Sequence, residues 1–310
     1  MTVELMRALG ALAEAPGRET ERLADLLGLD RVPLPEEYTE LFLFQAYPYA
    51  SVYLGIEGML GGDARDRVAG FWRVVGKGGT PPGEPDHLAA ILGLYATLVE
   101  LELREEVTER RAALRRARAT CLVEYLLSWL PAFLDKLLEI APAPYRRWAL
   151  LLERVLKEEV GELGAGEEEA VILRGAVSHA PPVTGSSPAE DMLVPARSGV
   201  IITRADLAAG ARSLGLTLRA GERRYALEAM LSQDQPAVIE WLRGQAISWA
   251  GRHRAREVWL PAMSRWWTAR ALESARYLGG FDRRGPCRPP GAVHDAGAGV
   301  IPPASGEGSR

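Results

Sequence analysis

The chain has 310 residues, of which 47% are hydrophobic and 25% are charged, and its formal net charge is −4. This composition is typical of a globular protein with a sizeable core, and the length predicts about two domains. No run of about 18 uncharged apolar residues occurs, so we expect no membrane span. The N-terminal segment is interrupted by charges and the two cysteines are far apart, so we expect no secretion signal and a cytoplasmic protein.

The net charge conceals a division along the chain. Residues 1–170 carry 19 Lys+Arg and 29 Asp+Glu, whereas residues 171–310 carry 18 and 12, which gives −10 and +6. An acidic N-terminal part attracts cationic segments and repels nucleic acid. The charge pattern therefore argues against nucleic acid as a partner of the whole chain.

Apolar residues recur at helical spacing through the first half of the chain, as in Leu88, Ile91, Leu92 and Tyr95. Alternating apolar and polar positions, which would indicate strands, are scarce. The pattern predicts a bundle of helices at about 2–15, 18–28, 36–60 with a break at Tyr47-Pro48, 63–76, 85–104, 108–129, 131–140 and 143–163.

The second half is divided by changes in composition. Residues 164–199 are rich in Gly, Pro, Ser and acidic residues and are predicted to be a linker. Helical periodicity returns with Thr203 as a potential N-cap and Gly215 as a helix end, and further helices are predicted at 221–232, 236–256 and 261–279. The expected fold is all-α, with a helical bundle (1–163), the linker (164–199), a smaller helical C-terminal module (200–279) and a disordered tail (280–310).

Signatures of catalysis are missing from the sequence. The segment VVGKGGT at 74–80 lacks the spacing and the Ser or Thr of a phosphate-binding loop. The four histidines are isolated, and neither HExxH nor GxSxG occurs. We therefore expect a protein that is not an enzyme, with no catalytic residue, no metal ligand and no cofactor.

One polar cluster precedes an apolar helix in the sequence TPPGEPDHLAAILGLYATL, residues 80–98. A helix that begins at Pro85 would place Asp86 in its first turn, where a carboxylate is stabilising, and would favour a neutral His87. Helix capping alone accounts for these residue types, so at this point capping and ligand binding are both open.

The C-terminal module leaves two further interpretations open. Five tryptophans, Trp241, Trp249, Trp259, Trp266 and Trp267, stand near arginines, a combination found in recognition surfaces. Their spacing favours a buried helix face. The short helices that follow residue 203 also permit a helix-turn-helix, so a DNA-binding transcriptional regulator that uses the C-terminal helices is the alternative function.

Three segments together carry a family resemblance. They are EPDH at 84–87, LFLFQAYPYASVYLGIEGMLGG at 41–62 and CLVEYLLSWLPAFLDKLLEIAP at 121–142. In order and spacing they resemble the TorD/DmsD/NarJ family of redox-enzyme maturation chaperones over residues 36–160. Tyr125 stands where many members have histidine, and Ser128 where they have proline, so no role is assigned to these two positions.

The resemblance implies a cytoplasmic all-α chaperone that is not an enzyme. Its partner would be the apo form of a molybdopterin oxidoreductase subunit, or its twin-arginine signal peptide, held until cofactor insertion and export, and a homodimer is compatible with the family. Glu84 and Asp86 would bind the peptide's guanidinium groups, Pro85 would stiffen the turn, and His87 would donate or accept a hydrogen bond. The remaining candidates for the peptide-binding site are Tyr47, Tyr49, Tyr95 and Trp129, for which packing in the core is an equal alternative.

Overall fold

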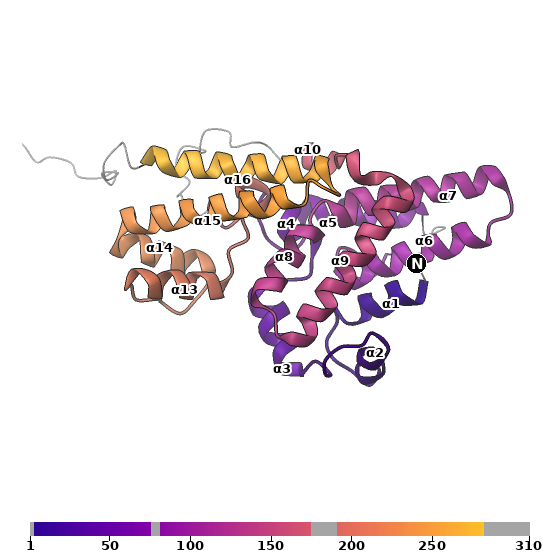
Figure 1. The fold of residues 1–310 in the computed structure, drawn as a ribbon, viewed down its shortest axis with the longest axis horizontal. Coiled ribbons are helices and arrows are strands. Elements are labelled where there is room, and N and C mark those ends of the chain that lie inside the picture. Colours follow the sequence, from indigo (N-terminus) through magenta and orange to yellow (C-terminus); the bar gives the residue numbers. More distant parts are fainter. Residues whose placement is uncertain (1–2, 76–80, 175–190, 282–310) are drawn as a thin grey trace, which may run out of the picture.

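The computed structural model describes residues 3–75, 81–174 and 191–281, and within these ranges it contains helices and no β-strand (Figure 1). The expected all-α class is confirmed. The N-terminal bundle consists of α1 (Val3–Ala11), α2 (Thr20–Leu26), α3 (Pro35–Tyr38), the π-helical η1 (Thr39–Gln45), α4 (Ala50–Leu54), α5 (Gly62–Val75), α6 (Leu88–Arg104), α7 (Thr108–Thr120), the π-helical η2 (Cys121–Leu127), α8 (Leu130–Ile140) and α9 (Ala143–Leu163).

The C-terminal part begins with short elements and continues into longer helices. The elements are the 3₁₀ turn η3 (Ala165–Glu167), α10 (Val171–Arg174), α12 (Pro195–Ser198), α13 (Arg204–Leu214), α14 (Arg223–Gln233), α15 (Gln235–Ala255) and α16 (Pro261–Phe281). Helices α15 and α16 run side by side along the longest axis of the molecule (Figure 1). No helix in the described ranges combines the length and the apolar character that a membrane crossing requires.

Two predicted helix boundaries are wrong, and both lie near the polar cluster. The helix expected from Pro85 begins at Leu88, because His87 has extended backbone angles (φ −65°, ψ 140°) and acts as the N-cap. The helix expected over 36–60 is interrupted as predicted but ends at Leu54. The chain then forms a loop in which Gly58 has φ +64°, a conformation that glycine adopts without strain.

Aromatic side chains fill the centre of the bundle. Tyr53 stacks on Trp129 with ring centroids 5.2 Å apart, and Phe42 meets Tyr145 edge to face at 5.0 Å. Such offset and edge-to-face contacts match the charge distribution of aromatic rings. The indole N–H of Trp148 donates to the carbonyl of Leu9 at 2.9 Å, so α9 is tied to the end of α1.

Helix α8 connects the bundle to the C-terminal helices through charged side chains. The ammonium group of Lys136, which is 1% exposed, lies 3.0 Å from both carboxylate oxygens of Asp206 in the first turn of α13. Asp135 pairs with Arg256, the C-cap of α15, and the indole of Trp267 on α16 donates to the carbonyl of Ser128 at 2.9 Å. The C-terminal helices are therefore held against the bundle by specific polar contacts.

Short helical elements occur between the bundle and α13 in the part of this segment that the structure describes. Residues 165–174 form η3 and α10, and Glu124 accepts hydrogen bonds from the backbone N–H groups of Val171 and Ile172. At the end of α12, Gly199 has φ +69°, and a Cβ there would lie 2.5 Å from the backbone nitrogen of Ala271 on α16. Most of the tail expected over 280–310, and residues 175–190 of the expected linker, lie outside the described residues. The division into domains stays a prediction.

A buried histidine lies where α15, α16 and α12 meet. His253 is 0% exposed, sits between Trp249 and Trp267, and its Nε2 lies 2.8 Å from the carbonyl oxygen of Gly199. Because a carbonyl only accepts, Nε2 carries the proton of a neutral ring. Burial, together with Arg256 and Arg252, lowers the pKa of His253 to about 3.

We predict that Lys136→Met lowers the free energy of unfolding by about 3 kcal/mol or more, because it leaves Asp206 buried without its cation. Lys157→Met is the matched control: Lys157 forms an exposed pair with Glu153, which contributes at most about 1 kcal/mol. Urea denaturation of both variants measures the difference. Equal losses in the two variants would show that the buried pair has no special role.

We also predict that acidification destabilises the fold through His253. An unfolded histidine has a pKa of about 6.5, and the folded value is lower. The contribution of the neutral His253 to the free energy of unfolding is therefore fully present above about pH 6.5 and is lost as the pH falls below it. Between pH 7 and pH 5 this histidine alone accounts for a loss of about 2 kcal/mol. Denaturation of the wild type and of His253→Gln at both pH values tests this: the variant should lose less stability between them, and an unchanged loss contradicts the prediction.

Candidate functional site

The EPDH segment is a joint between α4 and α6. The backbone N–H of Ala50 donates to the carbonyl of Asp86 at 3.0 Å, and the N–H of Leu88 donates to the carbonyl of Pro48 at 2.8 Å. Between these bonds Tyr49 and His87 form an isolated antiparallel bridge. The pairing holds the starts of two helices together, because each partner directly precedes a helix.

Asp86 faces the interior of this joint. Asp86 is 2% exposed. Its Oδ2 accepts a hydrogen bond at 3.2 Å from the backbone N–H of Ser51, in the first turn of α4. A carboxylate at this position satisfies one of the free amides at a helix start and is favoured by the helix dipole. Asp86 therefore caps α4 from a distant part of the sequence and is turned away from the surface.

His87 caps the second helix of the joint. Its Nδ1 accepts a hydrogen bond at 3.2 Å from the backbone N–H of Ala89, so this nitrogen is unprotonated. Burial lowers the pKa of His87, and the carboxylates of Glu14, Glu84 and Asp86 oppose that shift only in part. At neutral pH the ring is therefore neutral, and its Nε2–H is available as a donor.

Glu84 is the exposed acid of the segment. The hydroxyl of Tyr49 donates to Oε2 of Glu84 at 2.6 Å, and the ring of Tyr49 meets that of His87 edge to face with centroids 4.8 Å apart. Burial and the hydrogen bond to Glu84 both raise the pKa of the Tyr49 hydroxyl, which remains a donor. Oε1 of Glu84 has no hydrogen-bond partner within the described ranges, so it can accept a bond from a ligand.

These side chains border an open hollow of about 760 Å³, which we call the acidic hollow. Its lining residues come from the turn after α1, from α3 and α5, from both sides of the EPDH joint and from the first turn of α6. They are Glu14, Ala15, Tyr38, Tyr49, Trp72, Pro82, Gly83, Glu84, His87, Ala89 and Ala90. Among the described residues, two carboxylates and no lysine or arginine line it. Its field therefore favours a cation.

Three residues of this hollow were missed by the sequence analysis. Glu14 follows α1, Tyr38 ends α3, and Trp72 lies on α5, so no local motif connects them with Glu84. Burial raises the pKa of Tyr38, with a further contribution from Glu14 and Glu84, as expected for a hydroxyl near both acids. The buried indole nitrogen of Trp72 has no hydrogen-bond partner among the described residues, although buried indole N–H groups usually have one.

The other predicted aromatic residues lie elsewhere. Tyr95 and Trp129 are both 0% exposed and belong to the core, so they do not line a surface. Tyr95 hydrogen-bonds to Glu159 and accepts from Arg118 at 3.0 Å, within a buried group of charges that joins α6, α7 and α9. Tyr47 lines a different hollow, described below. Of the predicted set, the acidic hollow brings together Glu84, His87 and Tyr49.

The chemistry available in the described residues is that of binding. No group of three or more His, Cys, Asp or Glu side chains in these ranges is arranged to hold a metal ion. Burial strongly raises the pKa of the Cys121 thiol, which keeps it protonated and unreactive. The acidic hollow instead combines anionic, aromatic and hydrogen-bonding groups, which suits a segment that carries cations beside apolar side chains.

We predict that Asp86→Ala lowers the free energy of unfolding by about 1–2 kcal/mol, because it removes the cap of α4 and leaves the Ser51 amide buried without an acceptor. Glu84→Ala, its neighbour on the surface, should change stability by less than about 0.5 kcal/mol. Thermal and urea denaturation distinguish the two. If Asp86→Ala were as stable as the wild type, the capping role would be refuted.

The comparison with known families agrees with the segments that form this joint. The family model described as nitrate reductase delta subunit matches residues 9–135, which include the EPDH segment and the elements from α2 to η2. No curated protein matches the chain. The matched family consists of soluble cytoplasmic maturation chaperones of molybdoenzymes, which act with nitrate reductase catalytic subunits and are not themselves catalytic. Residues 9–135 of the chain are therefore similar to the nitrate reductase delta subunit family, in agreement with the NarJ/TorD-like chaperones that the sequence resembles.

Proposed function

We propose that this protein is a cytoplasmic chaperone that binds the apo form of a molybdopterin-dependent oxidoreductase subunit and holds it until the cofactor is inserted. The acidic hollow is the proposed site of contact, and a twin-arginine signal peptide is its proposed ligand. The observation that carries this proposal is the arrangement of Glu84, Tyr49 and His87 at the edge of a hollow that, in the described part of the chain, is lined by two acids and by no lysine or arginine.

The geometry of Glu84 suits a guanidinium group. Tyr49 holds one carboxylate oxygen at 2.6 Å, which fixes the orientation of the side chain before a ligand arrives. A carboxylate that is already oriented loses less side-chain entropy on binding. Arginine forms charge-assisted bonds to carboxylates, so two adjacent arginines match two acids, Glu84 and Glu14.

The rest of the hollow suits the apolar part of such a peptide. The rings of Tyr38 and Trp72 offer apolar area at the wall. The neutral ring of His87 supplies a hydrogen-bond donor at the same wall. Binding here would cover an apolar signal sequence and so prevent its aggregation or early export.

A chaperone of this kind discriminates between states of its client. Before the cofactor is inserted, the oxidoreductase exposes surfaces that its folded, loaded form buries. We therefore propose that affinity is higher for the apo subunit than for the loaded one. Equal affinity for both forms in a titration would contradict this part of the proposal.

We predict that a synthetic peptide with two adjacent arginines before an apolar stretch binds the full chain, and that Glu14→Gln combined with Glu84→Gln weakens the binding at least tenfold. The reason is the loss of charge-assisted hydrogen bonds, for which tenfold corresponds to about 1.4 kcal/mol. Isothermal titration calorimetry measures the affinity, and the binding should weaken further with added salt.

The matched control is Glu106→Gln combined with Glu109→Gln, which removes the same charge from exposed positions outside the acidic hollow. This control should bind the diarginine peptide with wild-type affinity. A version of the peptide with two glutamines in place of the arginines should not compete with the diarginine peptide for the wild-type chain. If both double variants bind alike, or if the diglutamine peptide binds as well as the diarginine peptide, the acidic hollow is not the site.

The alternative of a DNA-binding regulator stays a prediction, as does a homodimer. Within the C-terminal helices, Trp249 and Trp267 are 1% and 2% exposed, so they pack in the interior and offer no platform for bases, which confirms the expected core role of these two. The family assignment of residues 9–135 supports the chaperone over the regulator.

A further inference from the structure

A second hollow lies where the N-terminal bundle meets the C-terminal helices. It encloses about 850 Å³ between the loop of residues 55–61 on one side and α12 with the first turns of α13 and α14 on the other. Four arginines and two glutamates line it, and we call it the arginine hollow. Most of its charged residues lie beyond residue 135, outside the part of the chain that the family model matches.

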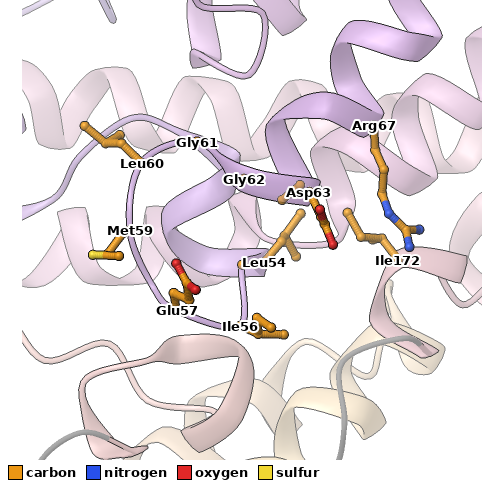
Figure 2. Close-up of a pocket in the computed structure, with 12 residues that line it drawn as sticks. Leu54, Ile56, Glu57, Met59, Leu60, Gly61, Gly62, Asp63, Arg67 and Ile172 are labelled. Atoms are coloured by element: carbon orange, nitrogen blue, oxygen red, sulfur yellow. The ribbon is translucent and has the colours of Figure 1, made fainter.

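The loop side of the arginine hollow is apolar and exposed. Ile56, Met59 and Leu60 line it and are 54%, 61% and 58% exposed. Figure 2 shows the loop as an open arch, with Met59 and Leu60 directed away from it. The arch is held in place at Gly58, where a Cβ would lie 3.3 Å from Val194, so three large apolar side chains are presented on a supported turn. Such a concentration of exposed apolar side chains marks an interaction site.

The opposite side carries positive charge that is only partly neutralised. Arg197 pairs with Asp191 at 3.2 Å, and Arg224 pairs with Glu228 at 3.0 Å. Arg204 has no ion pair within the described ranges and lies over the ring of Phe44, with its guanidinium carbon 5.8 Å from the ring centroid.

Arg223 is the more buried of the two arginines without an ion pair. It donates to the carbonyl of Ile202 at 2.7 Å, and burial lowers its pKa, with Arg204 adding to that effect against the attraction of Tyr53, Tyr47 and Asp206. An anion beside Arg204 and Arg223 would relieve the repulsion between these two cations. Glu57 and Glu222 also line the hollow and form no ion pair among the described residues. Because Asp191 and Glu228 already pair with Arg197 and Arg224, Arg204 and Arg223 are the two lining cations left to pair with carboxylates of a ligand.

We propose that the arginine hollow binds a segment of a partner protein in which carboxylates stand next to apolar side chains. The carboxylates would pair with Arg204 and Arg223, and the apolar side chains would cover Ile56, Met59 and Leu60. This complementarity favours a peptide over a nucleic acid. A phosphate backbone would pair with the arginines, but it would leave the apolar side chains of the arch exposed to water or in contact with charged phosphates.

The arginine hollow is distinct from the acidic hollow but lies close to it. Tyr47 lines the former and Tyr49 the latter, and two residues of extended chain span only about 7 Å. The two hollows have opposite charge, so they select different segments. The proposal for the arginine hollow does not depend on the twin-arginine proposal, and each can fail alone.

The test uses a fluorescein-labelled probe peptide, Gly-Glu-Leu-Glu-Asp-Phe-Glu-Leu-Glu-Gly, titrated with the full chain and followed by fluorescence anisotropy. The probe should bind, and a version with Gln and Asn in place of Glu and Asp should bind at least tenfold more weakly. Arg204→Glu should weaken binding of the acidic probe at least tenfold and leave the diarginine peptide unaffected. Met59→Ser, a change on the exposed arch, should also weaken binding of the acidic probe.

The matched control is Arg110→Glu, which makes the same charge change at an exposed position in the first turn of α7. It should bind the acidic probe like the wild type, and circular dichroism should show all variants folded. If Arg204→Glu does not fold, Arg204→Gln and Met59→Ser serve in its place. The proposal is overturned if the probe does not bind, if Arg110→Glu weakens it equally, or if a single-stranded oligonucleotide binds more tightly and depends on Arg204.

Discussion

The buried ion pair between Lys136 and Asp206 holds the first of the C-terminal helices, α13, against α8 of the N-terminal bundle. Removing an ammonium group and a carboxylate from water is costly, and the cost is offset only when both groups find enough partners. Here Lys136 also contacts Glu139, and Asp206 accepts from the backbone and the hydroxyl of Thr203. Asp206 thus caps α13 and anchors it to α8 with the same carboxylate. Because Arg204 begins α13, two residues earlier, this pair also fixes where the wall of the arginine hollow stands.

The EPDH segment divides its tasks between structure and surface. Asp86 and His87 each cap a helix, and the short backbone pairing around them makes the joint rigid. Only Glu84 remains at the surface, oriented by Tyr49. A binding carboxylate mounted on a rigid joint is already placed for its ligand, which reduces the ordering cost of recognition. Asp86 therefore supports the proposed binding site without facing the ligand, whereas His87 both caps α6 and lines the acidic hollow.

The small net charge of the chain results from two larger, separated charges. Part of this division appears in the two hollows: Glu14 and Glu84 line the acidic hollow, whereas all four arginines of the arginine hollow lie beyond residue 170. Because the two hollows differ in charge, the acidic hollow favours a cationic segment and disfavours an acidic one, and the arginine hollow does the reverse. A client subunit offers both kinds of segment, whereas a signal peptide by itself offers mainly one.

The sequence alone determined the all-α class, most helix positions and the family resemblance of the N-terminal part, because helical periodicity and short motifs are local properties. It also located Glu84 beside a helix start. It could not decide that Tyr95 and Trp129 are buried, since periodicity shows that a face is apolar but does not show which helix covers it. Nor could it find Glu14, in the turn after α1, and Trp72, on α5, which share no motif with Glu84. Only the packing of the turn after α1 and of α5 around the EPDH joint brings these side chains to one hollow, because contacts between distant segments depend on how whole helix faces fit together.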